Sequence, residues 1–542
     1  MNVRIIKNLI ATGSLILLAS TGLVSTAHAQ GSGLPWVGTW SAAPAEFIFN
    51  SSNVTLGFDQ QTFRQVIHTT LGGTSARIHL SNIYGTAPLT FSDVHIAVNT
   101  GYRTVNVQTD KAVTFGGATS ITIPSGQEVF SDPIAFTVAP VSDVAISFYL
   151  PGTTPLTTVD THVFTETTES ITYTAGDQSA AATLPGSGVD SRFFFLTGLD
   201  VQNTAATGTL VPFGASITDG YHSSNNSNHR WPNYLAQRFA TAGLNIGILN
   251  QGIAGAGILE DSEPIYGDSG LHRFNRDVVS QPGTRWTILS DFPINDLNDN
   301  PTPTTSQLTT AYQTLITQAH AQQIKLFCST LTPFAGENNN GTPINWTPAK
   351  ETIREAINTW IRSANSGCDG VIDMDTAVHD PNNPTFYLPA YDSGDGLHPN
   401  DAGYQAMAAA VDLSLFMSST PLAPVVAPTG CGTIKAGQVL TPGASLKSCD
   451  NRFNLTLQTD GNLALYFGTT VLWTSATNGK PSAQAVLEPT GNFIITDSNG
   501  NPLWATNSDN NPGSTLSLQN DGNLVMYTTT GHPVWNTYTN GH

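Results

Sequence analysis

The sequence predicts a protein of three folded parts: an all-β sandwich, a central α/β domain with a parallel sheet, and a β-prism. Three observations predict this fold class. The first part alternates polar and apolar residues with period two, the middle part alternates buried-type strands with amphipathic helices, and the last part contains a threefold repeat. A chain of 542 residues is too long for one core and has room for roughly three or four domains.

The N-terminal residues have the features of an export signal. Arg4 and Lys7 precede a short apolar run that ends in "AHAQ", so we expect a signal peptide over residues 1–29, cleaved after Ala29. The run is shorter than the roughly 20 apolar residues that cross a membrane, so we expect no membrane span. These features predict a secreted, extracellular protein, in which disulfides are stable.

The composition is acidic and poor in charged residues. Lys and Arg number 20 against 39 Asp and Glu, which gives a net charge of −19. This balance argues against a nucleic acid partner, because nucleic acid binding needs a basic surface. The four cysteines allow three pairings. We favour the disulfides Cys328–Cys368 and Cys431–Cys449 over free thiols, because each pair lies within one predicted domain.

Residues 36–207 are predicted to form the β-sandwich, with a jelly roll as a related possibility. The segments "ARIHLSNIY", "VHIAVNT", "SITIPSG" and "VAISFYLPG" are short strands between Gly, Pro, Asn and Asp turns. The sequence gives this domain no clear role.

Residues 208–417 are predicted to form a parallel sheet covered by helices on both faces. The expected strands are "TLVPFGA", "NIGILNQG", "RWTILSDF", "IKLFCSTL" and "GVIDMD", and the expected helices cover 231–243, 305–323, 348–365 and 400–417. Ligands of such sheets bind beyond the carboxyl ends of the strands. Ser216 follows the first of these ends.

Ser216 is a candidate nucleophile, and a serine hydroxyl needs a base to activate it. The segment "YDSGDGLHPND" places Asp395 and His398 three residues apart, so that the carboxylate can hold one imidazole nitrogen while the other points away. We expect Ser216, His398 and Asp395 to form a catalytic relay. The alternative interpretation is that this segment is only a turn and a helix cap, with Asn400 as the N-cap.

Two further strand ends offer donors for an oxyanion. "NQGIAGAG" is a Gly-rich turn with backbone N–H groups, and "FPINDLN" carries the side-chain amide of Asn295. Taken alone, the first segment is more typical of a tight turn and the second of an Asx-type cap than of a catalytic site. Their convergence with the serine, histidine and aspartate at one edge of the sheet predicts ester hydrolysis.

The segments "GASIT", "NQGIAG", "INDL" and "DGLHPN" resemble, in order and rough spacing, the four sequence blocks of the SGNH (GDSL-type) hydrolases. The resemblance covers about 210–417. In addition, "WVGTWSAAP" and "RQVIHTTLGG" resemble the N-terminal part of a secreted bacterial subgroup of that family.

This resemblance implies a flavodoxin-like α/β/α hydrolase domain with Ser216 as nucleophile, His398 as base and Asp395 as its orienting acid. It implies an oxyanion hole formed by the backbone N–H groups of Ser216 and Gly255 and by the amide of Asn295. It also implies that no metal and no other cofactor is needed.

The sequence departs from the family pattern at two positions. The usual Gly-Asp-Ser reads Gly-Ala-Ser because Ala215 replaces the aspartate, whose usual task is to brace the turn. The usual Gly-x-Asn-Asp begins with Pro293, which stiffens the loop and removes one N–H. An inactive relative is therefore one alternative. The nucleophile elbow of the α/β-hydrolases, Gly-x-Ser-x-Gly, does not fit because Thr218 replaces its second glycine.

The C-terminal repeats are joined to the middle domain by a Pro-rich segment, 418–430, which we expect to be a semi-rigid spacer. "LQTDGNLALY", "LEPTGNFIIT" and "LQNDGNLVMY" begin the repeats, and each is followed by a tryptophan. Trp473, Trp504 and Trp535 recur at an interval of 31 residues, which is typical of a β-prism with one sheet per repeat. We expect these tryptophans to form a shared core.

The first and third repeats follow Q-x-D-x-N-x-V-x-Y, with Ala464 in place of Val, and resemble the bulb-type mannose-binding lectins. Alternate residues of a strand share a face, so such a row presents donors and acceptors to sugar hydroxyls. The resemblance implies two carbohydrate sites: Gln458, Asp460, Asn462 and Tyr466, and Gln519, Asp521, Asn523 and Tyr527. The middle repeat has Glu488, Thr490, Asn492, Ile494 and Thr496 at these positions, so we expect little or no binding there. The alternative is a purely structural prism.

Together these patterns predict a secreted SGNH-type serine esterase that removes acyl groups, with acetyl favoured, from a polysaccharide. The lectin domain, 431–542, would direct it to a carbohydrate, either that polysaccharide or a cell-surface glycan. Two alternatives stay open. One is a lipase or a general short-chain esterase, and the other is a carbohydrate-binding adhesion protein with an inactive hydrolase domain.

Overall fold

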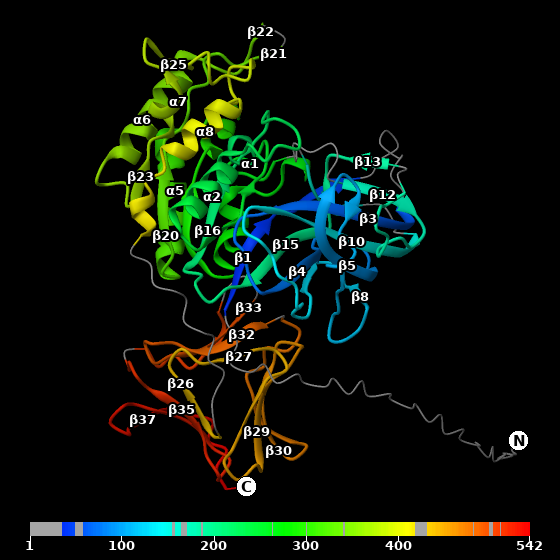
Figure 1. The fold of residues 1–542 in the computed structure, drawn as a ribbon. Coiled ribbons are helices and arrows are strands. Elements are labelled where there is room, and N and C mark those ends of the chain that lie inside the picture. Colours follow the sequence, from blue (N-terminus) through cyan, green and yellow to red (C-terminus); the bar gives the residue numbers. More distant parts are fainter. Residues whose placement is uncertain are drawn as a thin grey trace, which may run out of the picture.

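The computed structural model describes most of the chain, and its elements are drawn in Figure 1. The described residues are 35–48, 58–153, 158–163, 171–185, 188–262, 264–299, 301–339, 342–417, 431–480, 482–497, 502–509 and 511–541. The predicted signal peptide, 1–29, and the predicted spacer, 418–430, lie outside them. Among the described helices, none is long and apolar enough to cross a membrane.

Three large hydrophobic cores, beside one small cluster of Ala97, Val105 and Ala145, organise the described residues. The first draws its residues from 37–206, the second from 210–416 together with Ala43, and the third from 434–526. We propose that these cores mark the three predicted domains, 36–207, 208–417 and 431–542.

The N-terminal domain is an all-β sandwich in which apolar residues of facing sheets meet. Phe63 on one strand stacks on Phe148 of the next, and Phe58, Phe91 and Phe195 close the same cluster edge-on. The larger sheet has the order β13-β12-β3-β10-β5-β6, with β7 and β8 also on β5. Its strands are β3 (Asp59–Thr69), β5 (Leu89–Gly101), β6 (Thr104–Val105), β7 (Lys111–Ala112), β8 (Ser120–Ile123), β10 (Ser142–Thr153), β12 (Ile171–Ala175) and β13 (Gly188–Asp190).

Two smaller antiparallel sheets complete this domain, with the orders β1-β15-β4-β9 and β14-β11-β2. Their strands are β1 (Trp36–Ser41), β2 (Ala45–Ile48), β4 (Ser75–Asn82), β9 (Gln127–Phe130), β11 (Thr158–His162), β14 (Phe193–Phe194) and β15 (Leu196–Gln202).

The central domain contains a parallel sheet with the order β17-β16-β19-β20-β23, and β18 also pairs with β16. In chain order this is 2-1-3-4-5, the flavodoxin-like arrangement, as predicted. β16 is buried along its whole length, as a strand covered on both faces should be. The strands are β16 (Gly208–Gly214), β17 (Ile246–Ile248), β18 (Gln251–Gly252), β19 (Thr284–Leu289), β20 (Lys325–Ser329) and β23 (Gly370–Ile372).

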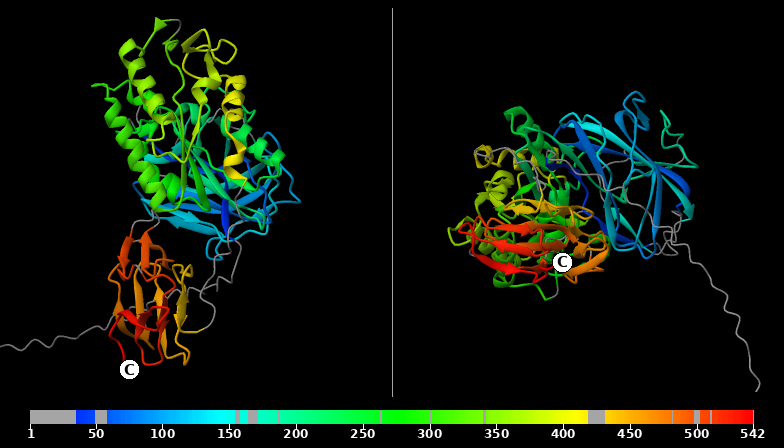
Figure 2. Two further views of the ribbon diagram at one scale, coloured as in Figure 1. Left: turned by 90° about the vertical axis from the view of Figure 1, so that its left-hand side faces the viewer. Right: turned by 90° about the horizontal axis from the view of Figure 1, so that it is seen from below.

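Helices flank this sheet in packed pairs, α2 with α8 and α5 with α6 (Figure 2). Thr304 and Gln307 form a capping box at the start of α5, and Thr347 caps α6. The helices are α1 (Ser216–Asp219), α2 (Trp231–Ala242), α3 (Gly270–Phe274), α4 (Phe292–Asp296), α5 (Thr305–Ala321), α6 (Pro348–Arg362), α7 (Met374–Val378) and α8 (Asp401–Ala409). Shorter elements of this domain are η1 (Pro264–Tyr266), η2 (Asn275–Val279), η3 (Leu413–Phe416), β21 (Asn338–Asn339), β22 (Thr342–Pro343), β24 (His379–Asp380) and β25 (Asn383–Tyr387).

The last predicted helix is shorter than expected. α8 ends at Ala409 and the chain continues as the short 3-10 turn η3, so the predicted helix over 400–417 is interrupted. Asp412 causes the break, because its carboxylate accepts hydrogen bonds from the backbone N–H and the hydroxyl of Ser414.

The N-terminal domain covers the edge of the parallel sheet at β17. The Thr70 hydroxyl donates to the Thr39 carbonyl at 2.7 Å and accepts from the Ile248 N–H at 2.9 Å, so it pairs the outward N–H of that edge residue. Gly247 approaches the carbonyl of Gly38 so closely that a Cβ at position 247 would lie 1.9 Å from that oxygen. The β-sandwich therefore protects an edge strand whose unpaired backbone groups would otherwise be open to association.

The C-terminal domain is a β-prism of three four-stranded sheets, β28-β29-β30-β31, β27-β32-β33-β34 and β26-β35-β36-β37. Trp473, Trp504 and Trp535 meet edge to face, with ring centroids 5.3–6.0 Å apart. The strands are β26 (Thr433–Lys435), β27 (Val439–Leu440), β28 (Ser445–Lys447), β29 (Phe453–Leu457), β30 (Leu463–Phe467), β31 (Thr470–Thr474), β32 (Ser482–Leu487), β33 (Phe493–Asp497), β34 (Pro502–Ala505), β35 (Thr515–Leu518), β36 (Leu524–Tyr527) and β37 (Pro533–Asn536).

Two disulfides are present, and they are the favoured pairs. Cys328–Cys368 joins β20 to the segment before β23, and Cys431–Cys449 closes the start of the prism.

Candidate active site

Ser216 lies at the carboxyl end of β16, where it begins the single turn α1. The Asp291 carboxylate, from the end of β19, holds this turn. It accepts hydrogen bonds from the backbone N–H groups of Ala215 (3.1 Å) and Ile217 (2.9 Å) and from the Thr218 hydroxyl (2.6 Å). Position 215 carries no carboxylate, and Asp291 supplies one to the same turn from the neighbouring strand.

Arg273 also stabilises this end of β16 through hydrogen bonds to backbone carbonyls. Its buried guanidinium donates to the carbonyls of Gly214 and Gln251, both at 2.9 Å, and pairs with Asp277 at 2.8 Å. The carbonyl ends of β16 and β18 are thus tied together by one cation. Such bonds are stronger than neutral ones, so they hold the Ser216 turn in place.

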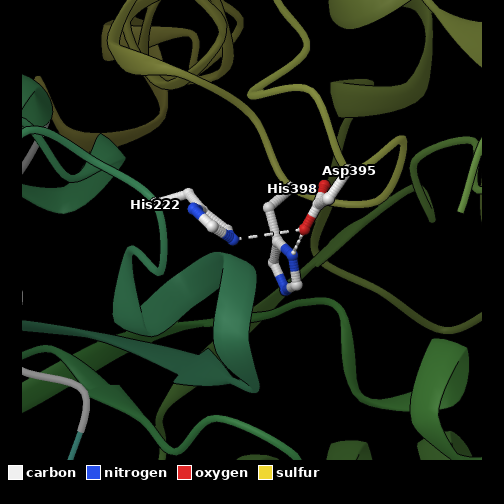
Figure 3. A group of neighbouring side chains, drawn as sticks. All are labelled: His222, Asp395 and His398. Atoms are coloured by element: carbon white, nitrogen blue, oxygen red, sulfur yellow. Dashed lines mark hydrogen bonds and ion pairs between the residues drawn. The ribbon is translucent and has the colours of Figure 1, made fainter. Parts of the chain in front are cut away.

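His398 lies between Ser216 and Asp395. Its Nε2 is 2.8 Å from Ser216 Oγ, and its Nδ1 is 2.6 Å from Asp395 Oδ2. With the ring proton on Nδ1, His398 donates to the carboxylate and accepts from the serine hydroxyl. Both Ser216 (9% exposed) and His398 (7%) are buried, so the hydrogen bond between them is largely shielded from water. Figure 3 shows the His398 ring against the Asp395 carboxylate.

The turn before α8 fixes the Asp395 carboxylate. Asp395 Oδ1 accepts from the backbone N–H groups of Leu397 (2.9 Å) and His398 (2.8 Å), which leaves Oδ2 for the imidazole. Burial alone would raise the pKa of Asp395, but the hydrogen bond and charge of His398 outweigh it and hold that pKa well below its usual range. Asn400 also caps α8, so the segment is a helix cap as well as the support of the relay.

The expected oxyanion donors lie on neighbouring loops. Among the described residues, neither the Ser216 nor the Gly255 N–H donates to another protein group. Gly255 has φ +84°, and a Cβ there would lie 2.6 Å from the Tyr266 ring, so this turn requires glycine. The Asn295 amide donates one of its two hydrogens to the Ala256 carbonyl at 3.0 Å, which orients the other. Pro293 lies in the first turn of α4, where a missing N–H is tolerated.

A cavity of about 630 Å³ adjoins these donors. Gly255 and Asn295 line it together with the acidic side chains of Glu260 and Asp299. Asp296 also lines the cavity. Burial raises the pKa of Asp296 to about 6, although its carboxylate accepts hydrogen bonds from the backbone N–H groups of Ile258 and Leu259, which act to lower that pKa. The lining therefore combines acidic side chains with apolar ones such as Leu259 and Tyr266, and it reaches the expected oxyanion donors Gly255 and Asn295.

The predicted sugar-binding rows of the prism are ordered by internal hydrogen bonds. Gln458 donates to the Tyr466 hydroxyl (2.9 Å), and Gln519 donates to the Tyr527 hydroxyl in the same way (3.0 Å). The carboxylates of Asp460 and Asp521 are exposed, and each accepts from the backbone of the asparagine two residues later, Asn462 or Asn523.

The asparagine of each row has a structural role as well. In all three repeats the side-chain carbonyl of this asparagine accepts a hydrogen bond from a backbone N–H in the segment after the last strand of the repeat. The acceptors are Asn462, Asn492 and Asn523, and the donors are Thr477, Ser508 and Thr539. This explains why the middle repeat keeps Asn492 although it has lost the aspartate and the tyrosine.

The sequence profile of the GDSL-like Lipase/Acylhydrolase family matches residues 213–406, which contain Ser216, Asn295, Asp395 and His398. Residues 213–406 are a GDSL-like hydrolase domain. The matched segment therefore indicates a hydrolase domain of the SGNH type. No curated protein matches the chain at a significant level.

The solved structures with similarity to the chain include a G-D-S-L family protein and several lectins. A lipolytic protein of the G-D-S-L family from Desulfitobacterium hafniense DCB-2 is 22% identical over 38% of this chain and 97% of its own, with a TM-score of 0.28. A lectin from Allium sativum is 37% identical over 20% of this chain and 99% of its own, with a TM-score of 0.17. The mannose-specific agglutinin of snowdrop, Galanthus nivalis, complexed with methyl-α-D-mannoside, is 28% identical over 20% and 99%, with a TM-score of 0.17.

Three residues of the hydrolase domain near the relay were not found from the sequence. They are Asp291, which holds the serine turn, Glu337, whose charge acts on Asp395 and His398, and His222, which lies beside Asp395 (Figure 3). Asp291 lies in the predicted strand "RWTILSDF", directly before "FPINDLN", but is not one of the motif residues, and Glu337 lies in a segment without a motif. His222 follows the serine block by a few residues, and its nearness to Ser216 in the chain was the one available signal.

Proposed function

We propose that this protein is a secreted serine esterase that removes short acyl groups, with acetyl favoured, from a polysaccharide. The observation that carries the proposal is the continuous contact from Ser216 Oγ through the His398 ring to Asp395. In this proposal Ser216 is the nucleophile, His398 the general base and Asp395 the group that orients it.

The reaction proceeds in two halves. His398 Nε2 takes the proton of Ser216 Oγ as that oxygen attacks the ester carbonyl, and the N–H groups of Ser216, Gly255 and Asn295 stabilise the oxyanion. The proton then passes from His398 to the leaving sugar oxygen, which departs and leaves an acyl-serine. Water, activated by His398, hydrolyses the acyl-serine and restores the Ser216 hydroxyl.

The cavity beside the oxyanion donors favours a sugar ester over a lipid. A groove for a long acyl chain is lined chiefly by apolar side chains. Here Glu260, Asp299 and Gln307 line the cavity, and these side chains suit hydroxyl groups. The Asp291 contacts also support an active enzyme, because they brace the serine turn despite Ala215.

The test of this proposal is hydrolysis of p-nitrophenyl acetate and release of acetate from acetylated xylan, mannan and pectin. We expect turnover of the small ester and of at least one polysaccharide. Ser216→Ala should lower kcat at least about a thousandfold, because the nucleophile is lost. Wild-type turnover no higher than that of the variant would exclude an esterase and leave the adhesion protein with an inactive domain.

We further propose that the prism binds carbohydrate through the rows that begin at Gln458 and Gln519. The exposed carboxylates of Asp460 and Asp521 beside ordered amide and phenol groups support this. Truncation of the chain after residue 430 should leave p-nitrophenyl acetate hydrolysis unchanged and lower the rate on insoluble polysaccharide, because the tether is lost. Equal rates of both forms on the insoluble substrate would mean that the prism has no part in substrate targeting.

A further inference from the structure

His222 is a titratable side chain beside the relay that the proposed mechanism does not use. It lies in the segment after α1 with φ +67°, a conformation that histidine adopts more readily than most residues. This backbone places its Nε2 3.4 Å from Asp395 Oδ2. Figure 3 shows that the imidazoles of His222 and His398 both contact the same carboxylate oxygen.

The three side chains present metal-ligating atoms in a small space. One nitrogen of His222, one nitrogen of His398 and one oxygen of Asp395 all lie within 4.8 Å of one another. A tetrahedral ion with bonds of about 2.0–2.1 Å holds neighbouring ligand atoms about 3.3 Å apart. The His222 Nε2–Asp395 Oδ2 separation of 3.4 Å already has this value.

The third ligand requires a small movement and the transfer of one ring proton. His398 Nδ1 is 2.6 Å from Asp395 Oδ2, which is a hydrogen bond and too short for two ligands of one ion. A shift of the ring by about 0.7 Å brings this pair to the tetrahedral separation. The ring proton then moves from Nδ1 to Nε2, and the ion binds the lone pair that this leaves on Nδ1.

The donor set selects the kind of cation. Two imidazoles and one carboxylate suit Zn²⁺ and neighbouring transition metals, whereas Mg²⁺ and Ca²⁺ prefer oxygen ligands. The site is open to solvent, since the His222 side chain is 43% exposed and that of Asp395 is 26% exposed. The Glu337 carboxylate adds a further negative charge nearby.

We propose that Zn²⁺, or a transition metal of the same class, binds between His222, Asp395 and His398 and reversibly inhibits the esterase. This inference rests on the proposed function, because the inhibited step is the activation of Ser216. Bound through Nδ1, His398 loses its hydrogen bond to Asp395, and its Nε2 carries the ring proton, so Nε2 has no lone pair free to accept the proton of Ser216 Oγ. Both effects stop proton transfer from Ser216 Oγ.

The kinetic test uses the full chain in a buffer that does not bind metals. ZnCl₂ should inhibit p-nitrophenyl acetate hydrolysis, and EDTA should restore the rate, whereas MgCl₂ at the same concentration should have no effect. His222→Gln should raise the Zn²⁺ concentration for half-inhibition about 10-fold or more, each variant being compared with its own uninhibited rate.

A matched control is available on the surface of the same domain. His272 forms a second cluster with Asp261 and Asp268. His272→Gln should therefore leave the half-inhibitory Zn²⁺ concentration at the wild-type value. Equal inhibition of wild type and His222→Gln, or no inhibition of the wild type, would overturn the proposal.

A binding measurement separates this inference from the proposed function. Calorimetric titration of ZnCl₂ into protein with Ser216→Ala and His272→Gln should show one ion per chain, and the additional change His222→Gln should weaken that binding by the same factor. Co²⁺ in place of Zn²⁺ should give the visible absorption of a tetrahedral site. Binding without any esterase activity in the wild type would refute the proposed function alone, whereas activity without this binding would refute the metal site alone.

Discussion

Asp291 shows how much of the site depends on a single side chain that no motif marks. Its carboxylate accepts three hydrogen bonds from the turn that carries Ser216. We predict that Asp291→Ala lowers kcat on p-nitrophenyl acetate about 10- to 100-fold with a smaller change in KM, because the nucleophile loses its fixed position. Steady-state kinetics checks this, and a thermal unfolding curve shows whether the variant is folded.

Thr218→Val is the matched control, because it removes one of the three contacts and leaves both backbone bonds to Asp291. It should lower kcat less than Asp291→Ala does. If Asp291→Ala has wild-type kcat, the turn holds Ser216 without this carboxylate.

The sequence could not reveal Asp291, and the reason is physical. Sequence patterns compare residues that are neighbours along the chain, so Ala215 indicates that the serine turn lacks the carboxylate that usually stabilises it. The brace comes from the end of β19, which the parallel pairing of Phe213 with Leu289 places beside the serine turn. By contrast, Asp395 and His398 share one turn, and their spacing alone predicts their contact.

At the scale of elements, long segments with strong caps were predicted closely. α2, α5 and α6 begin at the predicted residues, since Thr304 and Thr347 accept hydrogen bonds from the first turns of α5 and α6. Short elements such as α7 were missed, because five residues carry too little periodicity to detect. The interruption after α8 depends on one aspartate, Asp412, whose alternative bonds compete with the helix.

The turn before α8 provides the prediction at this scale. Gly394 and Gly396 both have positive φ, but only a Cβ at Gly396 would collide with backbone, 2.0 Å from Gly336. Gly396→Ala should therefore displace the Asp395–His398 turn and lower kcat about 100-fold. Gly394→Ala, with no atom within 4 Å of its Cβ, should retain far more activity despite its backbone strain. Equal kcat for the two variants would show that the packing on Gly336 does not position the turn.

For the whole molecule, the decisive feature is the join between the β-sandwich and the hydrolase domain. His162, from β11, pairs with Asp219 of the serine turn at 3.0 Å, and both side chains are buried. Thr70 accepts a hydrogen bond from the β17 edge in the same interface. These contacts are made across more than 50 residues of chain, so no sequence pattern reveals them. They predict that the two domains unfold as one unit, whereas the prism, with its own core, unfolds separately.

Asp219→Asn tests this join by calorimetry, with the prism transition as internal control. Breaking a buried ion pair leaves His162 without its partner, so the unfolding temperature of the joined domains should fall by about 5 °C at pH 6 while that of the prism stays unchanged.

Burial alone would lower the pKa of His162, but the Asp219 carboxylate outweighs it and raises that pKa. The stabilisation is therefore complete below the ordinary histidine pKa of about 6.5 and is lost as the pH rises through the raised value. The difference between wild type and variant should shrink accordingly at higher pH, and a difference that grows with pH would contradict the charged pair.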